Sequence, residues 1–221
     1  DPLWISVHDL DTFGEKHGRA LEWPGSDGAM RFFRLAISPD GRHAAAVLRD
    51  ATGDLLEVLD LDARRVVVSG FRDISSEDIL WVSESELLFA MDLAGTPAGD
   101  EHAGAIVVAD LAPHMEGDNG DTVEITPVLG FWSAEWGRPG NVHGFALSPD
   151  GDLLAFTRSG DVWVKELASD APPHQLTTGP GVITGAAFSP DMAWLAVAED
   201  PGRGLSTTFV IPNHRSAPLL V

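Results

Sequence analysis

Residues 145–156 read FALSPDGDLLAF, and this stretch decides the fold. An apolar run enters Ser-Pro-Asp-Gly and leaves as a second apolar run, which is typical of a tight β-hairpin. Pro149 fixes φ at the first turn position, and the Asp150 side chain can bond back to the turn amides. Gly151 supplies the positive φ that closes the turn. The sequence therefore predicts a hairpin whose turn is specified residue by residue.

The same hairpin recurs along the chain. Residues 34–47 read RLAISPDGRHAAAV and residues 185–197 read GAAFSPDMAWLAV, while residues 80–89, LWVSESELLF, keep the strands but lose Pro-Asp-Gly. The turn serines are 83 − 38 = 45, 148 − 83 = 65 and 189 − 148 = 41 residues apart, at Ser38, Ser83, Ser148 and Ser189. A period near 40 residues with four short strands per repeat indicates a β-propeller.

Each hairpin is followed by a third strand and by a fourth, edge strand; the third strand ends in an acidic residue and a leucine in three repeats and is weaker at residues 208–211. A third and a fourth strand, residues 3–10 and 19–23, also precede the first hairpin, without an inner hairpin of their own. We therefore expect an all-β chain, residues 1–221, that forms a single β-propeller domain of four-stranded antiparallel blades. About four and a half blades are visible: a half blade at 1–27 and blades at 28–72, 73–130, 131–180 and 181–221.

This count leaves the propeller without visible closure. We expect the chain to be part of a longer propeller, or to be completed by strands from elsewhere.

Positions within the hairpins are compared by counting back from the turn serine. The residues one and three before it are apolar in every repeat and are expected in the core: Ile37 and Leu35, Val82 and Leu80, Leu147 and Phe145, Phe188 and Ala186. The residue two before it is small in three repeats, as the crowded innermost strand requires: Ala36, Ala146 and Ala187. In the second repeat it is Trp81, the exception.

Charge and composition exclude several classes of function. The chain carries 34 acidic and 14 basic residues, a formal net charge of −20, so its surface repels phosphate backbones and a nucleic-acid partner is not expected. No cysteine is present, which excludes disulfides, thiol nucleophiles and cysteine metal sites. No run reaches the roughly 18 apolar residues of a membrane span, although association with a membrane complex stays compatible with the sequence.

The hairpins resemble those of the TolB-like and prolyl-oligopeptidase-type propeller families, whose blades carry the same SPDG turn. Residues 38–41 and 148–151 match completely, residues 189–192 lose the glycine, and residues 174–179, HQLTTG, resemble the fourth-strand phrase of those families. In those families the propeller is a protein-docking platform or the gate over a peptidase domain. The resemblance implies architecture more than function.

We therefore expect a non-catalytic propeller that acts as a docking or accessory subunit, with other protein subunits as partners and no cofactor. One alternative is the gating propeller of a serine peptidase whose hydrolase domain is absent from this chain, since the nucleophile pattern G-x-S-x-G does not occur here. Another alternative is a propeller that binds a small ligand or a metal. The resembling families are often exported, which favours an extracytoplasmic, periplasmic location.

Three groups of residues are candidate sites. The starts of the innermost strands are expected to line the mouth of a central channel, with a ring that could hold a peptide terminus or a small polar ligand: Arg31, Arg34, Asp78 and His143. The alternative is ordinary solvated polarity. The connection at 129–140 holds residue types enriched in interface hot spots, unless it only packs over the blade edge: Phe131, Trp132, Trp136 and Arg138.

A weak candidate metal site lies in an acidic turn, where oxygen ligands would suit calcium: Asp118, Asp121 and Glu124. The spacing is too short for an EF-hand loop, so an ordinary turn is favoured. The repeat serines are interpreted as turn caps because they recur once per blade at one structural position.

Overall fold

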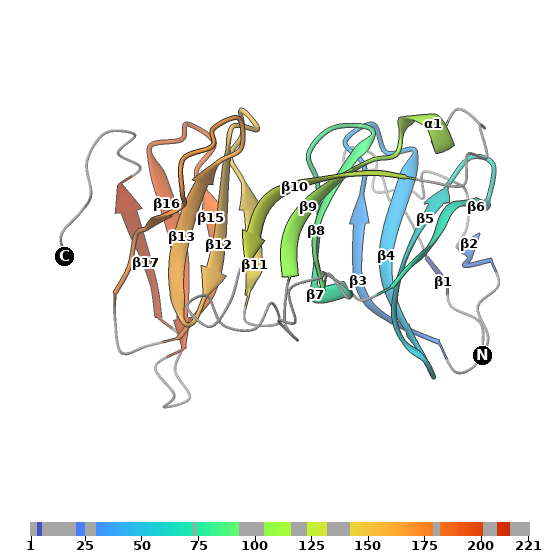
Figure 1. Cartoon of the computed structure of the whole chain (residues 1–221), viewed down its shortest axis with the longest axis horizontal. Helices are drawn as coiled ribbons and strands as arrows, with labels where there is room; N and C mark the ends of the chain where they lie inside the picture. Colours follow the sequence, from blue (N-terminus) through green and yellow to red (C-terminus); the bar gives the residue numbers. More distant parts are fainter. Residues whose placement is uncertain are drawn as a thin grey trace, which may run out of the picture. The chain divides into compact units, whose positions relative to one another are not determined.

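A computed structural model describes residues 4–5, 21–24, 30–72, 74–92, 104–115, 123–131, 142–178, 182–200 and 207–212. Apart from one short helix, α1 (Ala112–Met115), the regular elements of these residues are β-strands (Figure 1). Among them there is no helix that is long and apolar enough to cross a membrane.

The strands form consecutive antiparallel sheets, one per blade, in chain order. The first blade has the order β3-β4-β5-β6, with the bounds β3 (Arg31–Ile37), β4 (His43–Asp50), β5 (Gly53–Asp60) and β6 (Arg65–Phe71). The second blade consists of β7 (Ile74–Trp81), β8 (Glu86–Asp92), β9 (Gly104–Asp110) and β10 (Glu124–Phe131). The third consists of β11 (Val142–Leu147), β12 (Leu153–Arg158), β13 (Asp161–Glu166) and β14 (His174–Gln175).

The two ends of the chain hold smaller sheets. The fourth blade has three described strands, β15 (Val182–Phe188), β16 (Trp194–Asp200) and β17 (Thr207–Pro212), and the fourth strand expected near the C-terminus lies outside the described residues. The expected half blade is a two-stranded sheet of β1 (Trp4–Ile5) and β2 (Leu21–Glu22). The β-propeller class predicted from the repeat is confirmed.

The chain divides into two compact units. Unit 1 comprises Asp1–Leu93 and Ile106–Pro127, and unit 2 comprises Ala94–Ala105 and Val128–Val221. Each unit is described by itself below.

The SPDG turns have the geometry expected from their residues. In the three copies that keep Ser-Pro-Asp, the serine hydroxyl donates to the aspartate carboxylate, at 2.5 Å for Ser38, 2.6 Å for Ser148 and 2.5 Å for Ser189. The same oxygen accepts the backbone N–H five residues later, at 2.9, 2.9 and 3.0 Å. The fourth turn residue has positive φ in these three copies: 69° at Gly41, 79° at Gly151 and 59° at Met192.

We expect Met192→Gly to leave the free energy of unfolding unchanged or to raise it by up to about 1 kcal/mol. Methionine is held in the left-handed region with φ of 59°, which an L residue adopts at a cost and glycine adopts freely. The greater freedom of glycine in the unfolded chain offsets part of this gain. Urea unfolding of the two proteins measures the difference. A loss above 1 kcal/mol would mean that the Met192 side chain itself stabilises the turn.

The turn of the second blade is one residue shorter than the others. The Val82 N–H donates to the Glu86 carbonyl at 2.9 Å, which is the bond that Ser38 makes to His43 in the first blade. Val82, and not the serine after it, is therefore equivalent to the turn serine. Trp81 lies directly before the turn, so the sequence register of this repeat was wrong by one residue. The reason is that a turn without Pro-Asp-Gly need not keep the length that these residues impose.

Trp81 packs against the first blade because of this shift. Its indole N–H donates to the Ala36 carbonyl at 3.1 Å, and the centroid of its ring lies 6.5 Å from that of the His43 ring. On the opposite face of the first blade, buried Trp23 packs with residues of β4 and β5 and with Leu61. Unit 1 is thus layered from the half blade through blade 1 to blade 2.

The expected core positions of the innermost strands are buried unevenly. Phe145, Leu147 and Phe188 are half-buried, but Leu35 is 45% exposed and Ile37 is 37% exposed. The core prediction was therefore wrong for these two residues of β3. They lie on the half-blade side of the first sheet, where the half blade has no described inner hairpin to cover them.

Candidate protein-docking site

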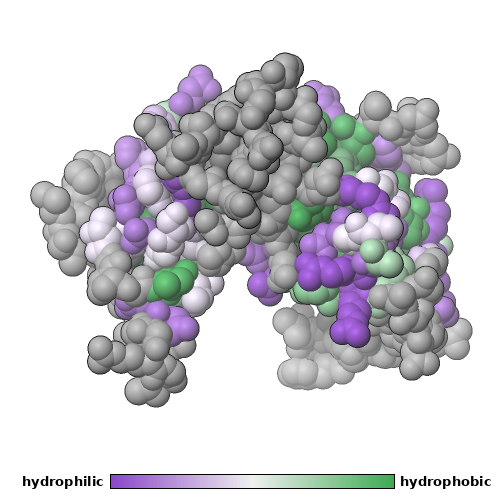
Figure 2. All heavy atoms as spheres, turned by 60° about the horizontal axis from the view of Figure 1, so that its bottom comes forward, coloured by the Kyte–Doolittle hydropathy of each residue, from purple (hydrophilic) through white to green (hydrophobic). Residues whose placement is uncertain are grey.

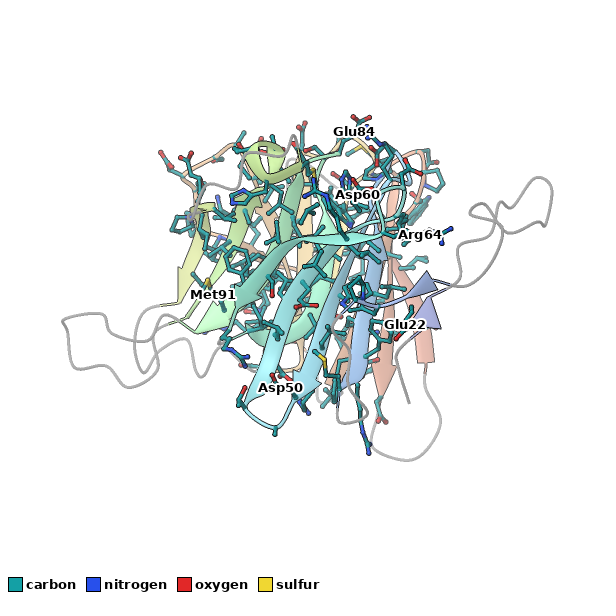
Figure 3. The ribbon with its side chains drawn as sticks, turned by 90° about the vertical axis from the view of Figure 1, so that its right-hand side faces the viewer. Glu22, Asp50, Asp60, Arg64, Glu84 and Met91 are labelled. Atoms are coloured by element: carbon teal, nitrogen blue, oxygen red, sulfur yellow. The ribbon has the colours of Figure 1, made fainter. Side chains whose placement is uncertain are left out.

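Four arginines gather at one end of unit 1, which we call the arginine end: Arg31, Arg34, Arg49 and Arg72. Strand pairing accounts for two of them, because the β3–β4 hairpin places Arg49 opposite Arg31, and the β4–β5 hairpin places Asp54 on the other side of Arg49. Figure 3 shows Asp50 at this end of the sheet and Asp60, Arg64 and Glu84 at the other end. Figure 2, which turns the lower end of the strands forward, shows hydrophilic side chains gathered over it.

The guanidinium groups are held by specific contacts. Arg49 makes a two-point contact with Asp54, with Nε 2.5 Å from Oδ1 and Nη2 2.7 Å from Oδ2. Its Cζ also lies 3.9 Å from the centroid of the Phe33 ring, a cation–π contact. These contacts fix the direction of the group, which lowers the entropy that it loses when a partner binds.

Two further ion pairs complete the end. Arg34 Nη2 on β3 lies 3.1 Å from Asp78 Oδ1 on β7, so this ion pair joins the first two blades. Arg72, which follows β6, donates to Thr52 Oγ1 at 2.5 Å and to Asp50 Oδ2 at 3.2 Å.

In each of these ion pairs the arginine side chain is more exposed to solvent than the aspartate. The side chains of Arg34, Arg49 and Arg72 are 54%, 46% and 45% exposed, whereas their aspartates are 17%, 20% and 24% exposed. Solvent therefore meets guanidinium groups more than carboxylates at this end. Four of the 14 basic residues of a chain with net charge −20 are gathered in this way, so the arginine end departs sharply from the average surface.

Hydrogen bonds to the Asp50 carboxylate lower the pKa of this group to about 2. The hydroxyl of Thr52 is the largest cause, followed by Arg72 and the Thr52 backbone N–H. Because this folded-state pKa lies below the usual 3.8, the interaction stabilises the fold above about pH 3.8. That stabilisation is lost as the pH falls through 2.

We expect Arg72→Ala to raise the pKa of Asp50 from about 2 toward 3.8. The substitution removes one hydrogen bond to the charged carboxylate and leaves those from Thr52. A carboxyl-detected NMR titration measures the value. The control is Arg65→Ala at the other end of β6, which should leave it unchanged. An unchanged pKa in Arg72→Ala would contradict the contact.

The structure brings together three of the four residues expected at the channel mouth. Arg31, Arg34 and Asp78 lie in unit 1, with Arg34 and Asp78 in direct contact. His143 is the second residue of β11 in unit 2, so its place in the same ring stays a prediction. Sequence reasoning missed Arg49 and Arg72, although the Ala-Thr-Gly sequence at 51–53 is a turn signal that places Arg49 next to a strand end.

The other two candidate sites lie mostly outside the described residues. Phe131 is the last residue of β10, while the rest of the aromatic connection is not described: Trp132, Trp136 and Arg138. Of the acidic turn, Glu124 is the exposed first residue of β10, while Asp118 and Asp121 are not described. Within the described ranges, no three His, Asp or Glu side chains are grouped so that they could hold a metal ion.

Comparison with known proteins supports the fold. No family model matches the sequence, and no curated protein matches it. The crystal structure of TolB from Acinetobacter baumannii has a TM-score of 0.55 and 16% identity, covering 92% of this chain and 46% of that chain. The Cps50 (Swd1) β-propeller domain of Myceliophteria thermophila has a TM-score of 0.60 and 15% identity, covering 90% of this chain and 60% of that one.

This chain therefore spans about half the length of the TolB structure and about three fifths of the Swd1 domain. At these identities the likeness shows the β-propeller fold alone. Membership of the TolB-like repeat family, which the SPDG turns suggest, stays a prediction.

Proposed function

We propose that this chain is a non-catalytic β-propeller that serves as a docking or accessory subunit, and that the arginine end receives an acidic segment of a partner protein. The observation that carries the proposal is the exposure of oriented guanidinium groups, paired with largely covered carboxylates, on a strongly acidic chain. Arginine is among the residues most enriched in interface hot spots.

The chemistry of the arginine end fits carboxylates. Guanidinium groups bind carboxylates at two points, as Arg49 already does with Asp54. Arg31 begins the innermost strand beside this pair and is exposed. A nucleic-acid partner carries phosphates that these arginines would also attract, but the net charge of −20 opposes the approach of a long polyanion. A short acidic protein segment carries fewer charges and meets less of that repulsion.

A non-catalytic role is supported by the state of the repeat serines. Ser38, Ser148 and Ser189 each donate to an aspartate within the turn and accept a backbone N–H. Their hydroxyls are occupied by closing the hairpin, which is the same task in each blade. A catalytic serine would need a base reserved for it at one site.

The proposal is tested by measuring binding of a fluorescein-labelled, glutamate-rich peptide by anisotropy at physiological salt. We expect the double variant Arg31→Glu, Arg72→Glu to bind it at least about tenfold more weakly, the effect of losing roughly 1.4 kcal/mol at an interface. The control is Arg64→Glu, Arg65→Glu, which makes the same change of charge at exposed positions of the other end.

Equal weakening by both double variants would show that only net charge matters, and the arginine end would lose its role. A second measurement tests the non-catalytic part. Turnover of peptide or ester substrates that a single serine substitution abolishes would contradict it.

A further inference from the structure

The fourth blade bears a row of small apolar residues across its three strands. Ala187 on β15 pairs with Ala196 on β16, and Ala196 pairs with Val210 on β17. Directly paired residues of a sheet share a face. The alternate residues Leu195 and Ile211 point to the other face, where they pack in the cluster shared with blade 3. The row therefore faces away from the third blade.

The same row occurs in the first and third blades. In blade 1, Ala36 pairs with Ala45 and Ala45 with Val58. In blade 3, Ala146 pairs with Ala155 and Ala155 with Val164, and the two alanines stand at the same sequence distances from the turn serine as in blade 4. We call this arrangement the Ala-Ala-Val row.

The following blade covers the row in both of those cases. In blade 1, Ala45 and Val58 are fully buried, and Trp81 of blade 2 donates its indole N–H to the Ala36 carbonyl. In blade 3, Ala155 is fully buried in a cluster that includes Phe188 of blade 4. Each covering blade thus places an aromatic residue directly before the turn of its innermost strand.

The row of blade 4 has the same residues but is open to solvent. Val210 is 58% exposed, Ala187 is exposed, and Trp194, on the same face of β16, is 45% exposed. The three residues of the row carry no charge, in a chain with 34 acidic residues. An uncharged apolar sheet face of this kind is typical of a surface that another element covers.

We propose that the Ala-Ala-Val row of blade 4 is the docking surface for a further blade of the same propeller. The occupant is an antiparallel sheet whose innermost strand carries a large apolar side chain directly before its turn, because that is what covers the row in blades 1 and 3. This surface is separate from the arginine end, and the inference does not rest on the proposed docking function.

The 221 residues contain no cysteine, so a single introduced thiol is the only one among them, and its labelling is followed on the peptide that holds it. Val210→Cys is made both in the 221-residue chain and in the polypeptide as its source produces it, and the rate of maleimide labelling is measured in each. Val58→Cys, at the equivalent covered position, is the reference for a buried row.

We expect rapid labelling of Val210→Cys in the 221-residue chain. We expect the source polypeptide to be a monomer heavier than 23.5 kDa. Its Val210→Cys thiol should react at least about tenfold more slowly than in the 221-residue chain, at a rate close to that of Val58→Cys, because a covered thiol reacts only after local opening. Equally rapid labelling in both would overturn the proposal. Slow labelling in the monomeric 221-residue chain would also overturn it, since residues of this chain would then cover the row. Slow labelling only in an oligomer of 23.5-kDa chains would overturn it as well, since a second copy would then cover the row.

Discussion

Trp23→Ala is expected to lower the free energy of unfolding by about 3–5 kcal/mol, the range for truncating a large buried aromatic residue. Trp23 is fully buried and packs with Ala44, Leu48 and Leu59 on the first blade. Its ring meets Phe32 edge to face, with the centroids 5.3 Å apart. The residue follows β2, so it ties the half blade to the first complete blade.

A hydrogen bond adds to this packing. The Trp23 indole N–H donates to Glu57 Oε2 at 2.7 Å, and Ser69 donates to Oε1 at 2.8 Å. Glu57 is only 8% exposed, so Trp23→Ala also removes one donor from a buried carboxylate. Trp23→Phe separates the two effects in part, since it keeps a six-membered aromatic ring but loses the N–H together with the five-membered ring.

Urea unfolding of purified variants measures the effect, with Trp194→Ala as the matched control. Trp194 is 45% exposed, so the same substitution there should cost less than about 1.5 kcal/mol. If Trp23→Ala cost no more than Trp194→Ala, the half blade would not be packed on the first blade as described.

The hairpins could be predicted from sequence because their turns are local. Pro, Asp and Gly act within a few residues, and the resulting hydrogen bonds and positive φ values repeat in three blades. The predicted register was wrong at Trp81, because the turn that follows lacks Pro-Asp-Gly and no local rule fixes its length. The prediction that Leu35 and Ile37 are buried was wrong for another reason, because the burial of a residue in one blade depends on the neighbouring blade.

The candidate site was predictable only in part for a similar reason. The placement of Arg31, Arg34 and Asp78 on the innermost strands β3 and β7 follows from the repeat. The contact between Arg72 and Asp50 joins residues 22 positions apart, across β5 and β6. No pattern of charges along the sequence specifies it. The excess of exposed guanidinium over carboxylate is a property of the folded end and not of composition.

Gly144→Val is expected to lower the free energy of unfolding by about 2–6 kcal/mol, through two separate causes. Gly144 lies at the bulge of β11 with φ of 66°, where a β-branched residue is strained by about 1–3 kcal/mol. A Cβ there would also lie 3.2 Å from Gly185 Cα on β15 and 3.2 Å from Thr157 Cγ2. Crowding of this kind costs about a further 1–3 kcal/mol.

Two control variants separate these causes in urea unfolding. Gly151→Val has φ of 79° but nothing within 4 Å of its Cβ, so it should cost only the strain of about 1–3 kcal/mol. At Gly185 a Cβ meets nothing within 4 Å and φ lies outside the left-handed region, so Gly185→Ala should change stability little. Because the two innermost strands of unit 2 approach at Gly144, its loss should exceed that of Gly151→Val. Equal losses would mean that β11 and β15 do not approach this closely, and backbone strain alone would then explain the glycine.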